Sequence, residues 1–269
     1  MNKVILIISD ALRYDVARSN MGFLGHLVEK RLATLFRITG ELPSMSRPMY
    51  ETIHTGLPSH EHGIVANSIN RLSSRPNLFK AVSQAGKVTA AAAYFWISEL
   101  YNRSPYNPVE DKEIDDPSLP IQHGRFYMTD EYPDQELFAS AANMIRRFSP
   151  DYLLLHPMGM DYHGETFGSD SKEYRKHAVH QDAWLAPLIQ EWMEIGYIIL
   201  VSGDHGINSD GIHGGTTREQ REVPLFTIHP NVKGEGESDR PISQLQIAPT
   251  ILKLLDVSIP ATMKQPPLI

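Results

Sequence analysis

Residues 4–10 read Val-Ile-Leu-Ile-Ile-Ser-Asp, five aliphatic side chains followed at once by a serine and an aspartate. Two later stretches have the same form. Residues 152–155 are apolar and lead to His156, and residues 197–201 are apolar and lead to Ser-Gly-Asp-His at 202–205. Short continuous runs of aliphatic residues are typical of strands buried on both faces of a parallel sheet. We therefore expect three such strands, each ending in a polar turn.

Helical patterns separate these runs and complete the predicted architecture. Three of them, residues 78–85, 135–148 and 178–195, end at a glycine or before a proline, as helices often do, and a fourth covers residues 246–255. Alternation of strands and helices predicts an α/β fold, a doubly wound and mostly parallel sheet with helices on both faces. We expect one domain over residues 1–269. Residues 97–134 are rich in Pro, Asp, Asn and Tyr, and we interpret them as an inserted lid or cap loop. A surface excursion without function is the alternative.

Composition narrows the class of protein. The 269 residues are 41% apolar and 21% charged, which is enough for a full core. A net charge of -7 gives no global attraction to nucleic-acid polymers. The absence of cysteine excludes disulfides and thiolate ligands. The first apolar run is too short for a signal segment, and no later stretch offers the ~18 apolar residues of a membrane span, so we expect a cytoplasmic protein without a membrane partner.

Polar residues that could bind metal follow the ends of two predicted strands. Asp10 follows the first, and Asp204 with His205 follows the last. In doubly wound sheets ligands gather beyond the carboxyl ends of the strands, so these residues should meet. A lone Asp10 could also cap a helix. His213 stands before two glycines, which let the backbone approach a ligand closely.

A third cluster follows the middle strand. Residues 156–165 contain His156, Asp161, His163 and Glu165. Two imidazoles and two carboxylates in one loop are more typical of a metal site than of isolated structural residues. His156 could instead orient a ligand from behind.

Ser46 is the candidate nucleophile. It lies between Pro43 and Pro48, just before a helical stretch. A serine in this place could serve only as a helix N-cap. The same place lets helix N–H groups receive phosphate oxygens while a divalent metal activates the hydroxyl. A Gly-x-Ser-x-Gly motif is absent from the sequence, which disfavours a serine esterase.

Taken together, these motifs resemble the alkaline phosphatase superfamily, in particular its nucleotide pyrophosphatase/phosphodiesterase branch. The resemblance covers residues 4–10, 43–67, 152–165, 198–215 and 246–255. It implies two divalent metal ions, with Zn²⁺ as the expected metal. One ion would be held by Asp10, Ser46, Asp204 and His205, and His213 would bind the other.

The chain departs from the superfamily pattern at the second metal. The pattern there is Asp-x-x-x-His, and Asp161 fits its first position, but residue 165 is glutamate. Either Glu165 supplies a carboxylate or His163 supplies the nitrogen. A ligand set richer in oxygen would shift the preference from Zn²⁺ toward Mn²⁺.

Four further residues are candidate substrate contacts. The resemblance implies that Asn67 contacts a non-bridging phosphoryl oxygen, and a neutral amide suits the single charge of a diester. Arg47 could face either the phosphate or the solvent. Trp96 and Tyr101 offer aromatic faces to a base or arene, although core packing is the alternative for both.

The sequence thus predicts a metal-dependent phosphodiesterase or nucleotide pyrophosphatase that acts through a phosphoenzyme at Ser46. Its partner would be a small-molecule phosphoester such as a nucleotide. A phosphomonoesterase or phosphonate hydrolase of the same superfamily is the nearest alternative. A sulfatase is disfavoured because the Cys/Ser-x-Pro-x-Arg spacing is missing at Ser46. A catalytically degenerate metal-binding protein, suggested by Glu165, is an alternative from a different class.

Overall fold

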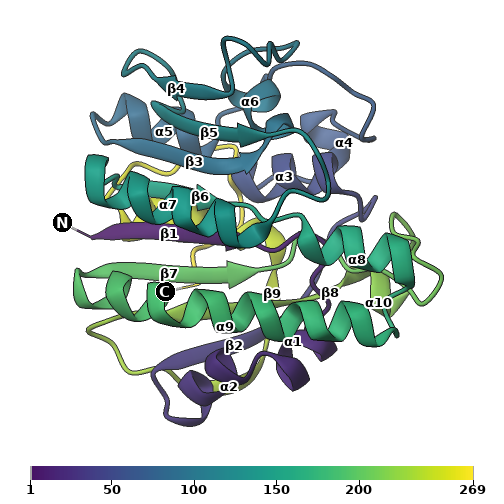
Figure 1. Ribbon diagram of the computed structural model, residues 1–269. Coiled ribbons are helices and arrows are strands. Elements are labelled where there is room, and N and C mark those ends of the chain that lie inside the picture. The colour runs from purple at the N-terminus through teal and green to yellow at the C-terminus, as the bar shows by residue number, and fades with distance from the viewer. Residues whose placement is uncertain (1, 269) are drawn as a thin grey trace.

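A computed structural model describes residues 2–268, in which nine strands form a single sheet (Figure 1). The strands are β1 (Lys3–Ile8), β2 (Ala33–Thr39), β3 (Thr89–Tyr94), β4 (Glu113–Asp115), β5 (His123–Tyr127), β6 (Tyr152–Leu155), β7 (Tyr197–Ser202), β8 (Glu222–Ile228) and β9 (Gly236–Ser243). Their order across the sheet is β4-β5-β3-β6-β1-β7-β8-β2-β9.

The sheet is mostly parallel, as the sequence predicts. β1 pairs in parallel with β6 and β7, and β3 pairs in parallel with β5 and β6. β8 is antiparallel to its neighbours β7 and β2, and β4 is antiparallel to β5. The non-sequential strand order shows that the chain crosses over repeatedly, which requires helices on both faces.

The described residues form eleven α-helices, of which ten lie between strands and one follows the last strand. They are α1 (Tyr14–Asn20), α2 (Gly22–Glu29), α3 (Ser46–Thr55), α4 (Ser59–His62), α5 (Leu78–Gln84), α6 (Phe95–Tyr101), α7 (Asp134–Phe148), α8 (Gly159–Phe167), α9 (Lys172–Glu194), α10 (Arg218–Arg221) and α11 (Ile247–Leu254). Among the described residues, none of these helices combines the length and apolarity needed to cross a membrane.

Two apolar cores lie on the two faces of the sheet. Ile5 and Ile7 of β1 pack into one core with α1, α2, α7 and α9, and Figure 1 shows α7 and α9 lying across this face. Val4, Leu6 and Ile8 alternate with them and pack into the other core with α3, α5, α6 and α11. Because both faces are covered, the central strands are apolar along most of their length. The predicted doubly wound fold is therefore confirmed.

Residues 97–134 differ from the predicted lid loop in their secondary structure. They include most of α6 and two strands, and β5 lies beside β3 with Ala90–Tyr94 opposite its five residues. β5 reads His-Gly-Arg-Phe-Tyr, and its glycine and arginine interrupt the apolar pattern by which a strand is recognised in a sequence. Much of the segment therefore extends the sheet toward one edge. A role of its remaining loops in covering substrate stays a prediction.

Candidate metal centre

The carboxyl ends of β1, β6 and β7 meet at one edge of the sheet and carry the polar residues singled out above. Asp10 follows β1, His156 follows β6, and Asp204 follows β7. β1 lies between the other two strands, so the three turns are adjacent. The sheet thus brings together residues that are far apart in the sequence.

Ser46 is the first residue of α3 and is almost fully buried. Its Oγ lies 3.1 Å from Nε2 of His205. The N-cap position belongs to Met45, so the hydroxyl of Ser46 does not cap the helix. The loop before it is fixed because Ser44 accepts a hydrogen bond from the N–H of Gly214 and donates its hydroxyl to the carbonyl of Gly215. The nucleophile candidate is therefore held beside the His213 loop.

One group of possible metal ligands consists of Asp10, Asp204 and His205, whose ligand atoms lie within 4.8 Å of one another. All three side chains are fully buried. Tyr50 donates its hydroxyl to Oδ2 of Asp10, and Nε2 of His156 lies 3.1 Å from the same oxygen. These two contacts fix the orientation of the Asp10 carboxylate and leave its other oxygen available.

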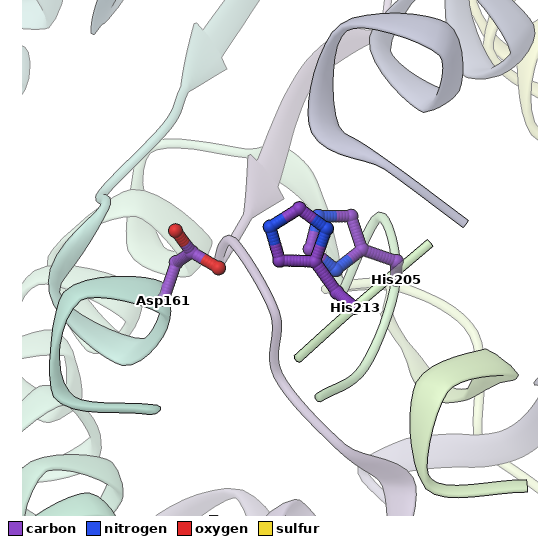
Figure 2. A group of neighbouring side chains, drawn as sticks. All are labelled: Asp161, His205 and His213. Atoms are coloured by element: carbon purple, nitrogen blue, oxygen red, sulfur yellow. The ribbon is translucent and has the colours of Figure 1, made fainter. Parts of the chain in front are cut away.

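A second group consists of Asp161, His205 and His213, again within 4.8 Å. Figure 2 shows the Asp161 carboxylate directed toward the two imidazoles, which stack with their ring centroids 4.5 Å apart. Glu165 lies four residues after Asp161 on α8, so both carboxylates are on one helix face. Oε1 of Glu165 lies 3.2 Å from Nε2 of His213.

His163 lies elsewhere. It follows Asp161 by two residues, about 200° around the helix, and its Nδ1 lies 2.7 Å from the carbonyl oxygen of Gly159. Its ring stacks on His177 with centroids 4.1 Å apart. Neither group of ligand atoms includes His163, and neither includes Glu165. Of the two alternatives for the second metal, the structure places Glu165 beside His213.

The buried carboxylates of the two groups would be stabilised by bound cations. Burial, together with the charges of Asp10 and Glu165, raises the pKa of Asp161 well above its usual range. Burial and the charge of Asp10 do the same for Asp204. Burial lowers the pKa of His205 to about 4, so this imidazole is neutral at neutral pH. Buried carboxylates this close together are unfavourable unless cations neutralise them.

The hydrogen-bond pattern fits bound cations. Within the described residues, one oxygen of each carboxylate and one imidazole nitrogen are buried without any hydrogen-bond partner: Asp10 Oδ1, Asp161 Oδ1, Asp204 Oδ2 and His213 Nδ1. Buried polar atoms normally have partners. Carboxylate oxygens and neutral imidazole nitrogens are ligands that bind Zn²⁺ and Mn²⁺.

The predicted phosphate contacts lie at the start of α3. Oδ1 of Asn67 accepts the backbone N–H of Arg47 at 3.0 Å. The guanidinium of Arg47 does not face solvent. Its Nη2 donates to Glu99 at 2.8 Å, and its Cζ lies 4.4 Å from the ring centroid of Trp96, which is half-buried.

Tyr101 does not offer a face to substrate, contrary to the prediction. It is buried in the core, where its hydroxyl donates to Glu51 and its ring packs against His54 and Phe79. Residues 95–101 form a helix rather than a loop, and Tyr101 lies five residues, about 140° around the axis, from Trp96. The two aromatic side chains therefore point in different directions.

Sequence reasoning missed two residues of this region, Tyr50 and Glu99. Tyr50 lies four residues after Ser46, and this spacing on a helix places it on the same face as the nucleophile. That signal was readable from the sequence. Glu99 gave no such signal, because it reaches Arg47 from a separate helix.

A serine hydroxyl between two groups of buried carboxylates and imidazoles, at the carboxyl edge of a doubly wound sheet, defines a protein of the alkaline phosphatase superfamily. Residues 4–213 match the family model of the type I phosphodiesterases and nucleotide pyrophosphatases, and the chain belongs to that family.

Curated relatives include GPI ethanolamine phosphate transferase 2 of Candida albicans, 26% identical over 96% of this chain. The catalytic subunit of the human GPI ethanolamine phosphate transferase 2 is 24% identical, also over 96% of the chain. The chain spans only 30% and 27% of the lengths of these two relatives.

Solved structures share the fold. Human ectonucleotide pyrophosphatase/phosphodiesterase 5 superposes with a TM-score of 0.74 at 14% identity, over 96% of both chains. An inactive form of the murine enzyme in complex with AMP has a TM-score of 0.72 at 14% identity, over 96% of both chains. A phosphonate monoester hydrolase from Silicibacter pomeroyi has a TM-score of 0.67 at 16% identity, covering all of this chain and 76% of its own.

Proposed function

We propose that the chain cleaves phosphodiesters with the help of two divalent metal ions and uses Ser46 as the nucleophile. The observation that carries this proposal is the position of Ser46, whose Oγ lies 3.1 Å from His205, the residue common to both groups of ligand atoms. A hydroxyl in this position can attack a phosphoryl group held by both sites.

Two sets of residues would hold the metals. Asp10, Asp204 and His205 would bind one ion, with Ser46 beside it, and Asp161, Glu165 and His213 would bind the other. Ions bound there would supply positive charge that lowers the pKa of the Ser46 hydroxyl and neutralises the phosphoryl oxygens. The family suggests Zn²⁺, and the carboxylates of Asp161 and Glu165 make Mn²⁺ an alternative.

The residues of the chain have distinct roles in this reaction. Ser46 loses its proton to solvent and attacks phosphorus, forming a phosphoserine diester while the first alcohol departs with a proton. Oδ1 of Asn67 accepts the backbone N–H of Arg47, so its side-chain NH2 group would be the part that holds a non-bridging oxygen. An incoming hydroxyl compound then attacks from the vacated side and releases Ser46.

Transfer rather than hydrolysis is a second candidate, because the curated relatives are named as ethanolamine phosphate transferases. The two reactions share the first step and differ only in whether water or an alcohol accepts the phosphoryl group. Relatives named for GPI suggest a lipid-linked substrate, whereas the AMP complex of a structural neighbour suggests a nucleotide.

The experiment compares bis-p-nitrophenyl phosphate with p-nitrophenyl phosphate after loading with Zn²⁺ or Mn²⁺, with Ser46→Ala in parallel. Faster turnover of the diester that disappears in Ser46→Ala supports the proposal. A preference for the monoester would make the chain a phosphatase, and full activity in Ser46→Ala would exclude the covalent step. Adding glycerol as an acceptor and measuring glycerol phosphoester product separates transfer from hydrolysis.

A further inference from the structure

The guanidinium of Arg47, next to the nucleophile in the chain, is buried and only partly satisfied. Arg47 is 2% exposed. Its Nη2 bonds Glu99, but its Nε and Nη1 have no hydrogen-bond partner within the described residues. Buried guanidinium N–H groups without acceptors are costly. Donors of this kind, held at the start of α3, suit an anionic ligand that arrives with the substrate.

Glu99 fixes this guanidinium and neutralises its charge. Oε2 of Glu99 lies 2.8 Å from Nη2 of Arg47, and the two side chains are almost completely buried. Oε1 accepts the side-chain amide of Asn70 at 2.9 Å and the backbone N–H of Tyr106 at 3.0 Å. Both oxygens are thus engaged. In the part of the chain that the structure describes, Glu99 is the only acidic residue that forms an ion pair with Arg47.

Arg47 and Asp10 both act electrostatically on the hydroxyl of Tyr94. Burial, Asp130 and Asp10 raise its pKa, and Arg47 opposes them. Tyr94 also packs against Trp96, whose ring lies under the guanidinium. A charge on Arg47 that was not neutralised would therefore act on a phosphoryl group bound beside Asp10.

The net charge of the Arg47–Glu99 pair affects which phosphate ester the site binds better. An ionised phosphodiester carries one negative charge, whereas a phosphomonoester carries nearly two at neutral pH. An arginine alone beside the nucleophile would favour the dianion. Paired with Glu99, Arg47 keeps two nitrogens, Nε and Nη1, free to donate but contributes no net charge, and Asn67, which bonds the backbone N–H of Arg47, is neutral as well.

We propose that Glu99 determines the specificity for charge at this site, so that the site accepts singly charged phosphodiesters in preference to dianionic monoesters. Glu99 does this by neutralising Arg47, whose remaining N–H groups donate to a phosphoryl oxygen. This inference rests on the proposed function, because it assumes that a phosphoryl group binds at Ser46.

The test is the binding of inorganic phosphate and of dimethyl phosphate, measured by calorimetry at pH 8 on the metal-loaded protein. Inorganic phosphate is then mostly a dianion and dimethyl phosphate a monoanion. Glu99→Gln should strengthen phosphate binding relative to dimethyl phosphate by roughly tenfold, the effect of one unscreened charge at this range. Asn70→Ala is the matched control, since it removes a hydrogen bond from Glu99 and keeps its charge. There the ratio of the two affinities should stay within about twofold of wild type.

Two further variants make the test decisive. Arg47→Gln leaves Glu99 unneutralised, so it should change the ratio in the opposite direction, and it decides the question if Glu99→Gln does not fold. The double variant Arg47→Gln/Glu99→Gln is again neutral and should return close to the wild-type ratio. An unchanged ratio in a folded Glu99→Gln protein that binds both anions would overturn the inference. If the wild-type protein binds neither anion, the proposed function fails and this inference fails with it.

Discussion

Oε1 of Glu165 lies 3.2 Å from Nε2 of His213, and Glu165 occupies the position where the superfamily pattern has a histidine. Glu165 and Asp161 share one face of α8, so a carboxylate reaches the place where an imidazole would bind. Glu165 is half exposed at its side chain, whereas His213 is mostly covered. In the proposed function, Glu165 would therefore offer an oxygen ligand to the second site in place of the nitrogen of a histidine.

Replacing Glu165 should change the metal preference of this site. Glu165→His restores the imidazole of the superfamily pattern, so it should raise the affinity for Zn²⁺ relative to Mn²⁺. Glu165→Ala should weaken binding of either metal by at least tenfold. Calorimetric titration of the metal-free protein measures both. His163→Gln is the matched control on the same helix, because His163 faces Gly159 and His177. A loss of affinity in that control equal to the loss in Glu165→Ala would contradict the assignment.

Tyr50 should contribute to metal affinity without binding metal itself. Its hydroxyl donates to the buried carboxylate of Asp10, an interaction that aligns the ligand. Tyr50→Phe keeps the ring in the core and removes only this bond, so affinity at the Asp10 site should fall roughly 10–100-fold. Tyr101→Phe removes a buried hydroxyl that bonds Glu51 and the backbone carbonyl of Tyr50, but no ligand side chain, and should leave metal affinity unchanged. The measurement is again calorimetric titration, and equal effects of the two variants would argue against alignment by Tyr50.

Asp161 should have opposite effects on stability with and without metal. Burial and nearby carboxylates raise its pKa, which means that its charge is unfavourable in the metal-free protein. Asp161→Asn removes that charge and should stabilise the metal-free protein by about 1–3 kcal/mol at pH 8. With metal present, the variant lacks a ligand and should be less stable than wild type. Urea denaturation in EDTA and in excess Zn²⁺ tests this prediction, and a variant less stable in both conditions would contradict it.

The parts of the site that follow strand ends could be predicted from the sequence. Asp10, Asp204 and His205 come directly after short apolar runs, and parallel strands end at a common edge whatever their order in the sheet. Ser46 could be located because a helix begins at it. These inferences depend only on local patterns, so they did not require knowledge of distant contacts.

The errors concern residues whose neighbours come from elsewhere in the chain. The sequence suggests that Tyr101 offers an aromatic face to substrate, with core packing as the alternative, and α6 turns it into the core toward His54 and Phe79. β5 was missed because its five residues show no apolar run. The contact of Glu99 with Arg47 joins residues 52 positions apart. Long-range contacts of this kind are set by packing, which leaves no periodic signal in the sequence.

Glu51 should make the stability of the protein depend on pH. It is buried between the hydroxyls of Ser73 and Tyr101, and burial raises its pKa from 4.5 to about 7. The folded protein therefore holds this proton more tightly than the unfolded chain does. The resulting stability is fully present below pH 4.5 and is lost as the pH rises through about 7.

The difference between the folded and unfolded pKa values of Glu51 corresponds to about 3 kcal/mol. Glu51→Gln cannot ionise, so its free energy of unfolding relative to wild type should rise by about that amount between roughly pH 4 and pH 9. Urea denaturation in EDTA across this range measures the difference, with the exposed Glu136→Gln as control. A difference that stays constant with pH would show that the pKa of Glu51 is the same in the folded and unfolded chain, which would contradict the prediction.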